Sequence, residues 1–134
     1  MKKTKSLSGT NAVFTESMRY IDNAIDILNN KAKREGEIYR DKKYVKMAGH
    51  TAYTGILYAL DNANLITLKK GQRADVKDYI AALAKQNKKM LDHFNDCYEV
   101  LHLMAGYDGY GNKKYLTNSI KNAEQLITWA ANKA

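Results

Sequence analysis

Residues 41–64, with the sequence DKKYVKMAGHTAYTGILYALDNAN, decide the fold of this chain. One set of apolar residues recurs there at the three- and four-residue steps of an α-helix: Val45, Ala48, Ala52, Ile56, Ala59 and Ala63. A second set spreads apolar character over much of the remaining surface: Tyr44, Met47, Tyr53, Leu57 and Leu60. A helix that is apolar on more than one side is buried on more than one side. We therefore predict that this helix, beginning near Asp41, is the most central one.

The same helix carries small residues that indicate close packing. Ala48, Gly49, Ala52 and Gly55 project little or no side chain. We expect a neighbouring backbone to approach the helix along these positions.

The same periodicity predicts helices before and after the central one. The first runs from about Thr15, its capping residue, to Arg34, and Gly36 ends it. A short helix begins after Asp75, and a longer one continues to about Ala105. Without a break, residues 75–105 would span about 45 Å, well beyond the roughly 30 Å of the partner helices. We place the break near Gln86 and Asn87.

The last helix follows the clearest turn in the sequence, residues 106–111, which contains three glycines. It runs from about Lys113 to Asn132. Long helices joined by short connections pack best as antiparallel neighbours. The sequence therefore predicts an all-α protein, an antiparallel four-helix bundle with one additional short helix between the second and fourth segments. Residues 1–10 are expected to be a flexible basic tail and residues 11–134 a single helical bundle domain.

Composition favours a globular intracellular protein. The chain has 134 residues, of which 45% are hydrophobic and 27% charged, and it contains no proline. Its one cysteine, Cys97, has no partner for an internal disulfide. The sequence contains neither an apolar run long enough to span a membrane nor a signal-peptide core. We expect a cytoplasmic protein without a membrane partner.

The charge of the chain admits a nucleic-acid partner. Lysine and arginine outnumber aspartate and glutamate by 22 to 14, which gives a formal net charge of +8. The basic residues that stand out are Lys42, Lys43, Lys46, Lys69, Lys70, Lys113 and Lys114. Lysines at helix ends are also often simply exposed to solvent. They indicate a nucleic-acid partner only if they share one face of the protein.

Catalytic and metal chemistry find little support in the sequence. Glu99 and His102 have the Glu-x-x-His spacing of di-iron bundles, but no second such pair accompanies them. Cys97 follows Asp96, whose charge raises a thiol pKa, so a structural cysteine is the better interpretation. No glycine-rich loop carries the lysine of a phosphate-binding loop. We predict no catalytic residue, no metal ligand and no cofactor.

Five residues are candidates for a binding site. His50 and Tyr53 lie in the central helix, where we expect His50 to be enclosed, either as a hydrogen-bonded core residue or as part of a small pocket shared with Tyr53 and His102. Tyr107 and Tyr110 lie in the glycine-rich turn. Their rings either contact a partner or stack on a base, or they fold back on the helix ends.

Two stretches resemble a family of small bacterial proteins, DUF5618. They are residues 43–53, KYVKMAGHTAY, and residues 98–103, YEVLHL, together with GYDG at 106–109. The resemblance covers most of the chain after the tail and implies a helical bundle of bacterial origin, but it supplies no activity. More remotely, the helix order is similar to that of the HEPN superfamily and of the bundle proteins encoded in intervening sequences of ribosomal RNA. That likeness concerns the fold and carries no residue roles.

Three functions follow as hypotheses. The leading one is a non-enzymatic bundle that acts through protein–protein interaction or self-association, and the alternative is a bundle that binds RNA or another polyanion. A HEPN-like nuclease is the third, and it lacks the usual motif because Arg40 and His50, the nearest pair, have nine residues between them. Lys46, four residues before His50, lacks the forked geometry that would replace an arginine.

Overall fold

The computed structural model describes residues 11–134 as an all-helical chain with one small hairpin. Its helices are α1 (Ala12–Asn30), α2 (Lys42–Asn62), α3 (Val76–Gln86), α4 (Lys88–Cys97), the π-helix η1 (Tyr98–Tyr107) and α5 (Lys113–Ala131). The strands β1 (Arg34–Glu35) and β2 (Ile38–Tyr39) connect α1 to α2. The predicted all-α class is confirmed. The predicted tail, residues 1–10, lies outside the described residues.

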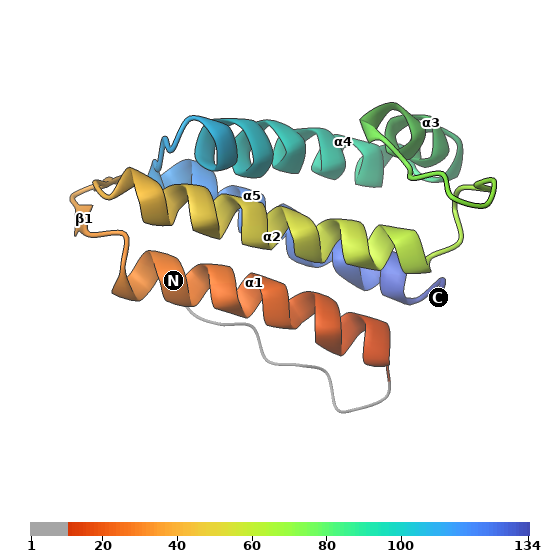
Figure 1. Ribbon diagram of the computed structural model, residues 1–134, viewed down its shortest axis with the longest axis horizontal. Helices are drawn as coiled ribbons and strands as arrows, with labels where there is room; N and C mark the ends of the chain where they lie inside the picture. Colours follow the sequence, from red (N-terminus) through yellow and green to blue (C-terminus); the bar gives the residue numbers. More distant parts are fainter. Residues whose placement is uncertain (1–10) are drawn as a thin grey trace.

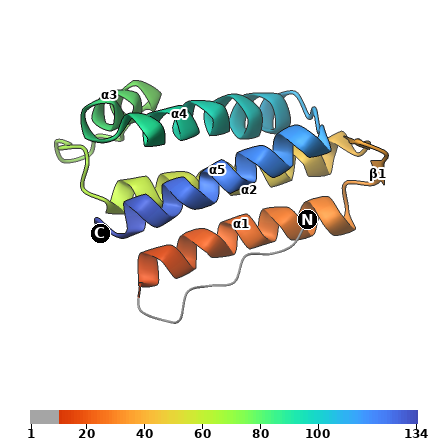
Figure 2. The same cartoon turned by 180° about the vertical axis from the view of Figure 1, so that it is seen from behind.

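The long helices lie side by side and alternate in direction. In Figures 1 and 2, α1 and α4 with η1 run one way, while α2 and α5 run the other. Helix α2 packs against α1, η1 and α5, so it is central, as its two apolar sets indicate. Its predicted inner stripe is buried, with Val45, Ile56 and Ala59 fully enclosed.

The two ends of the bundle differ in what they contain (Figure 1). One end holds the β1–β2 hairpin, the beginning of α2, and the turn between η1 and α5. We call this the hairpin end and define it as residues 31–46 and 107–115. The other holds the connection after α2 and the beginning of α3, residues 57–80, which we call the loop end.

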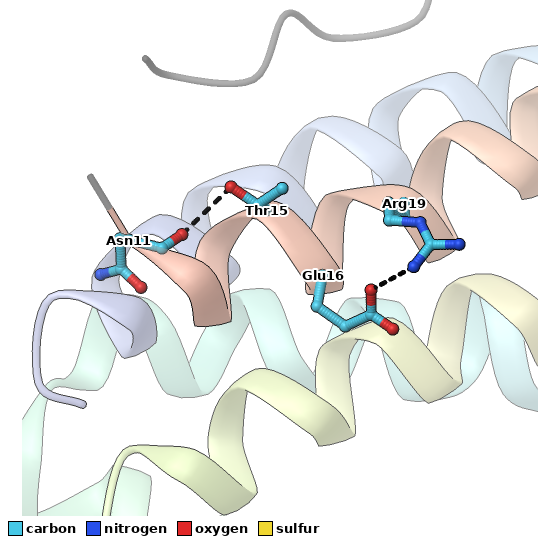
Figure 3. A network of polar contacts seen from close by, with 4 residues as sticks. All are labelled: Asn11, Thr15, Glu16 and Arg19. Atoms are coloured by element: carbon cyan, nitrogen blue, oxygen red, sulfur yellow. Dashed lines mark hydrogen bonds and ion pairs between the residues drawn. The ribbon is translucent and has the colours of Figure 1, made fainter. Parts of the chain in front are cut away.

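Helix α1 begins one turn earlier than predicted. Asn11, and not Thr15, is the N-cap, and its side-chain oxygen accepts hydrogen bonds from the amides of Val13 and Phe14 at 3.0 and 3.2 Å. Figure 3 shows Thr15 inside the first turn, where its hydroxyl donates to the Asn11 carbonyl. One turn further on, Arg19 pairs with Glu16 at 2.7 Å. Asparagine is preferred over threonine at the N-cap position, so the helix begins at the earlier of the two candidates.

The end of α1 also differs from the prediction, because a hairpin replaces its last turn. The chain leaves the helix after Asn30, and Lys33 adopts a left-handed backbone with φ of 56°. Gly36, with φ of 60°, forms the hairpin tip and does not end a helix. Strands of two residues are too short to leave an alternating pattern of apolar residues, so sequence periodicity does not predict them.

The breaks around α3 lie where they were predicted. Asp75 caps α3 in a complete capping box with Asp78. Asn87 has an extended backbone between α3 and α4, and its side chain accepts a hydrogen bond from the Met90 amide at 3.2 Å. One asparagine therefore ends α3 and begins α4. Asp41 occupies the N-cap position of α2 as expected, although its side chain makes no capping hydrogen bond.

Candidate functional site

The second half of the predicted fourth helix is a π-helix and not an α-helix. The switch occurs at Tyr98, and the wider helix continues for ten residues to Tyr107. Apolar periodicity does not distinguish the two forms, so the sequence predicted α-helix to Ala105. π-Helical segments are rare and occur frequently at functional sites.

Helices α2 and η1 touch through glycine. A Cβ atom on Gly49 would lie 2.7 Å from the Gly106 nitrogen and 2.8 Å from the Ala105 Cβ, and it would also meet the Leu101 carbonyl oxygen. Gly55 makes the corresponding approach to α1, where a Cβ would lie 2.9 Å from the Ser17 carbonyl oxygen. The small residues of α2 therefore admit neighbouring helices on two sides, as predicted.

Above this contact lies a cluster of rings. We define the aromatic cluster as His50 and Tyr53 from α2 and Tyr98, His102 and Tyr107 from η1. Tyr53 stacks on His102 with ring centroids 4.4 Å apart, and His102 meets Tyr98 at 5.2 Å. His50 lies 5.8 Å from His102. Four of the five predicted site residues thus come together, and Tyr98, one helical turn before His102, is the member that sequence reasoning missed.

His50 is exposed, so the expectation that it is enclosed was wrong. Gly49 occupies the position of α2 that faces η1, and the next residue points toward solvent. The imidazole lies over Gly106, where a Cβ would approach its Cε1 within 2.9 Å. His50 is therefore accessible to a ligand.

His102 is half-buried between His50 and the tyrosine rings. Its Nδ1 is enclosed and has no hydrogen-bond partner within residues 11–134. Burial, and secondarily the neighbouring His50, lowers the pKa of His102 below its usual value. The pair is therefore biased toward keeping the inner imidazole neutral.

Tyr110 does not join the aromatic cluster. It lines a small cavity of about 160 Å³ at the hairpin end, with Arg40, Lys42 and Asp108. Gly109, whose φ is 68°, turns the chain there against the Lys42 side chain. Of the three glycines in 106–111, Gly109 alone has a positive φ, while Gly106 and Gly111 serve close contacts.

The hairpin and this turn are joined by backbone hydrogen bonds. The Tyr39 amide donates to the Gly111 carbonyl at 2.8 Å, and the Lys113 amide donates to the Glu37 carbonyl at 2.8 Å. A bridge between Ile38 and Asn112 completes the contact. Segments far apart in the sequence thus form one continuous surface.

The predicted basic residues divide between the two ends. Five belong to the hairpin end, and they are Lys42, Lys43, Lys46, Lys113 and Lys114, while Lys69 and Lys70 belong to the loop end. The hairpin end has nine basic and four acidic side chains, whereas the rest of residues 11–134 has ten of each. The hairpin end therefore holds all of the excess positive charge in the part of the chain that the structure describes.

The lysines of the hairpin end are not neutralised locally. Arg40 pairs with Glu35 at 2.9 Å, but none of the five lysines forms an ion pair with any residue from 11 to 134. Lys43 places its Nζ 4.7 Å from the centroid of the Tyr44 ring. These charges are available to an external anion.

The residues considered for catalysis or metal binding lie in surroundings that do not favour either role. Cys97 is buried, its Sγ donates to the Ser119 carbonyl at 3.4 Å, and burial raises its pKa to about 12. Glu99 is exposed on η1 and does not face a second carboxylate site. Within residues 11–134, no three histidine, cysteine or acidic side chains are grouped to hold a metal ion.

Comparison with known proteins finds close relatives of undescribed activity. The family model for a domain of unknown function, DUF5618, matches residues 12–132. A solved structure of a protein of unknown function from Dyadobacter fermentans is 43% identical, covers 91% of this chain and 96% of its own, and superposes with a TM-score of 0.84. No protein with a curated description matches. Among the described helices, none has the length and apolar character needed to cross a membrane.

Proposed function

This chain belongs to the DUF5618 family, a domain of unknown function, and from its own surface we propose that it binds RNA at the hairpin end without catalysing a reaction. The observation that carries the proposal is the distribution of charge. The hairpin end has a net charge of +5, and the remainder of residues 11–134 is neutral. A basic patch confined to one face is the electrostatic signature of a protein that contacts phosphates.

The arrangement of the helices concentrates this charge. Lys42 and Lys43 begin α2, and Lys113 and Lys114 begin α5. The first turn of a helix already carries a partial positive charge, so lysine there is unfavourable for the folded protein. Two neighbouring helices with this arrangement form a surface suited to an anion of extended shape.

Exposed tyrosines favour RNA over an acidic protein or a membrane surface. Tyr107, Tyr110 and Tyr115 are exposed on the hairpin end among the lysines. Nucleic-acid surfaces combine a basic groove with aromatic rings in this way. Membrane binding by such a patch would instead use leucine, phenylalanine or tryptophan beside the basic residues.

The test compares two quadruple variants that remove the same charge. The hairpin variant changes Lys42, Lys46, Lys113 and Lys114 to glutamine, and the control changes Lys69, Lys70, Lys88 and Lys89, of which Lys88 and Lys89 also begin a helix. Fluorescence anisotropy with a generic labelled RNA at low and moderate salt measures binding. We expect the hairpin variant to lose at least about tenfold in affinity and to show a shallower salt dependence. The control should lose far less.

Several results would contradict the proposal. One is the absence of RNA binding by the parent protein at low salt, where phosphate contacts are strongest. Another is an equal loss in both variants, which would assign the effect to overall charge. Polyglutamate competing as well as RNA would favour the protein–protein hypothesis instead. Circular dichroism checks that each variant is folded, and sedimentation checks that self-association does not cause the change.

A further inference from the structure

We infer that Tyr107 is a stacking site for one nucleobase and that it makes the hairpin end selective for single-stranded RNA. This inference rests on the proposed RNA binding. It concerns a different feature of the surface, because it depends on a ring and not on the lysines.

Tyr107 is the most exposed of the three exposed tyrosines at the hairpin end. Its exposed fraction is 61%, compared with 48% for Tyr115 and 44% for Tyr110. Exposing an aromatic ring to water forgoes the stabilisation that burial provides. The ring lies at the end of η1, directly after Gly106.

The ring is also held in place, which separates it from an ordinary exposed side chain. It meets His102 with centroids 5.1 Å apart and planes at 78°, and it meets His50 at 5.7 Å and 81°. Both contacts are edge-type arrangements, which are favourable for aromatic pairs. A ring that is fixed before binding loses little conformational entropy when a base stacks on it.

The backbone beneath the ring is equally constrained. The Asp108 amide donates to the Leu103 carbonyl at 3.0 Å, and the Tyr110 amide donates to the Met104 carbonyl at 2.8 Å. These bonds close the end of η1 and fix the direction in which Tyr107 leaves it. The π-helix thus delivers the ring to the surface in a defined position.

Positive charge lies close enough to bind the phosphate of a stacked nucleotide. Lys46 is one helical turn before His50 on the same helix, and His50 touches the Tyr107 ring. Residues at this spacing have Cβ atoms about 5–6 Å apart. The extended, exposed Lys46 side chain can therefore reach a phosphate beside the ring. Asp108 is the acidic neighbour, and it favours a base over a phosphate directly on Tyr107.

Selectivity for single strands follows from the geometry of the ligand. In a duplex each base face is covered by the next base pair, so only an unpaired base offers its face to a side chain. Lysine contacts to the backbone do not make this distinction. The two kinds of contact can therefore be separated by experiment.

The experiment measures affinity for an unstructured 12-nucleotide RNA and for the same sequence as a duplex. Tyr107→Leu removes the ring and keeps apolar volume, and Tyr107→Trp keeps a stacking surface. A stacked base contributes about 1–3 kcal/mol, so Tyr107→Leu should weaken single-strand binding about 5- to 150-fold. We expect the duplex affinity to change less than twofold and Tyr107→Trp to preserve single-strand binding. Tyr58→Leu is the control, because Tyr58 belongs to the loop end and lies outside the proposed RNA-binding surface.

A fluorescence signal provides a second measurement. In a Trp129→Phe background, Tyr107→Trp places the only indole at the site. Single-stranded RNA should quench it, and the duplex should not.

The outcomes distinguish this inference from the proposed function. If Tyr107→Leu leaves single-strand affinity unchanged, or lowers single-strand and duplex affinity equally, the stacking site is refuted. RNA binding at the hairpin end still stands in that case if the quadruple lysine variant loses affinity for both RNAs. If the lysine variant binds both RNAs normally, the proposed function fails, whatever Tyr107→Leu does.

Discussion

The two ends of the bundle hold the same helices together by different kinds of contact. At the hairpin end, backbone groups join β2 to the turn before α5, and directly next to it Gly49 and Gly106 allow α2 and η1 to touch. At the loop end, the contacts between helices are made by side chains. Tyr79 donates a hydrogen bond to Asp61 at 2.5 Å, and Leu65, Ile66 and other apolar residues surround a cavity of about 510 Å³.

This difference shows where each end can tolerate change. Backbone contacts leave the side chains of the hairpin end free, so its surface can carry lysines and exposed rings that take no part in the packing beneath. The loop end uses its side chains for packing, and its charge is close to balanced. We therefore expect glycine substitutions next to the hairpin end to lower the stability of the fold. At the loop end, we expect side-chain truncations to do so.

The largest effect is expected from Gly49→Ala. The new methyl group would meet backbone atoms of η1 that cannot move independently, so the free energy of unfolding should fall by about 3 kcal/mol. Gly71→Ala at the loop end is the comparison, since no atom lies within 4 Å and its φ of 83° is the sole obstacle. That strain should cost about 1–2 kcal/mol. Urea unfolding followed by circular dichroism measures both, and equal losses would remove the distinction between the ends.

The next effect concerns two buried tyrosines. Tyr79→Phe removes the hydrogen bond to Asp61 and should lower the free energy of unfolding by about 1.5 kcal/mol. Tyr53→Phe should change it little, because the Tyr53 hydroxyl has no hydrogen bond within residues 11–134. Chemical denaturation at pH 7 tests the pair. A larger loss for Tyr53→Phe would show that the aromatic cluster depends on that hydroxyl.

The same tyrosines predict how the protein responds to alkali. Burial raises the pKa of both Tyr53 and Tyr79 above the usual 10, and the Asp61 hydrogen bond adds to the effect at Tyr79. The unfolded chain then loses these protons at lower pH than the folded one. The contribution of these two tyrosines to stability is therefore fully present below pH 10 and is lost as the pH rises above it. Unfolding curves from pH 9 upward should show a shallower decline in Tyr79→Phe than in the parent protein.

A smaller effect is expected in acid, from His102. Its pKa is lowered, mainly by burial, so the unfolded state binds the proton more readily than the folded state. The contribution to stability is present above the unfolded pKa of about 6.5 and is lost as the pH falls. Between pH 7 and 5, His102→Gln should weaken this dependence, which urea unfolding at the two pH values measures. An unchanged pH dependence in His102→Gln would place the acid-sensitive group elsewhere.

The parts of the fold that the sequence predicted correctly are those set by local chemistry. The inner stripe of α2 and the break at Asn87 depend on residues within one or two turns of each other. The π-helix was missed because Leu101 and Ala105, four residues apart, have the apolar spacing of an α-helix although they are buried in a π-helix. His50 was placed wrongly because adjacent residues on a helix point about 100° apart, and Gly49 took the buried direction.

The sequence predicted four of the five members of the aromatic cluster, but neither Tyr98 nor the electrostatics of the site. His50, Tyr53 and His102 were grouped correctly because each stands in a strongly apolar helix. The charge of the hairpin end depends on tertiary structure, because the bridge between Ile38 and Asn112 joins the segment before Lys42 to the segment that begins α5. Composition shows the excess of lysine, and the fold alone shows that it lies at one end.

The smallest effect is expected from lysines at the beginnings of two helices, where folding stability and RNA binding favour different residues. Lys113 and Lys114 lie in the first turn of α5, and Lys88 and Lys89 lie in the first turn of α4. Changing either pair to glutamine relieves repulsion from the helix dipole and should raise the free energy of unfolding by about 0.3–1 kcal/mol per lysine at low ionic strength. In about 1 M salt the gain should largely disappear through screening.

The two pairs should differ in RNA affinity. The Lys113 and Lys114 double variant should bind RNA more weakly, while the Lys88 and Lys89 double variant should bind it as the parent does. Thermal unfolding and anisotropy on the same preparations give both quantities. If the α5 pair became more stable and kept full RNA affinity, its lysines would have no role in binding, and the unfavourable charge at the hairpin end would need another cause. If it gained stability and lost affinity together, the destabilising lysines would be explained by the RNA that they contact.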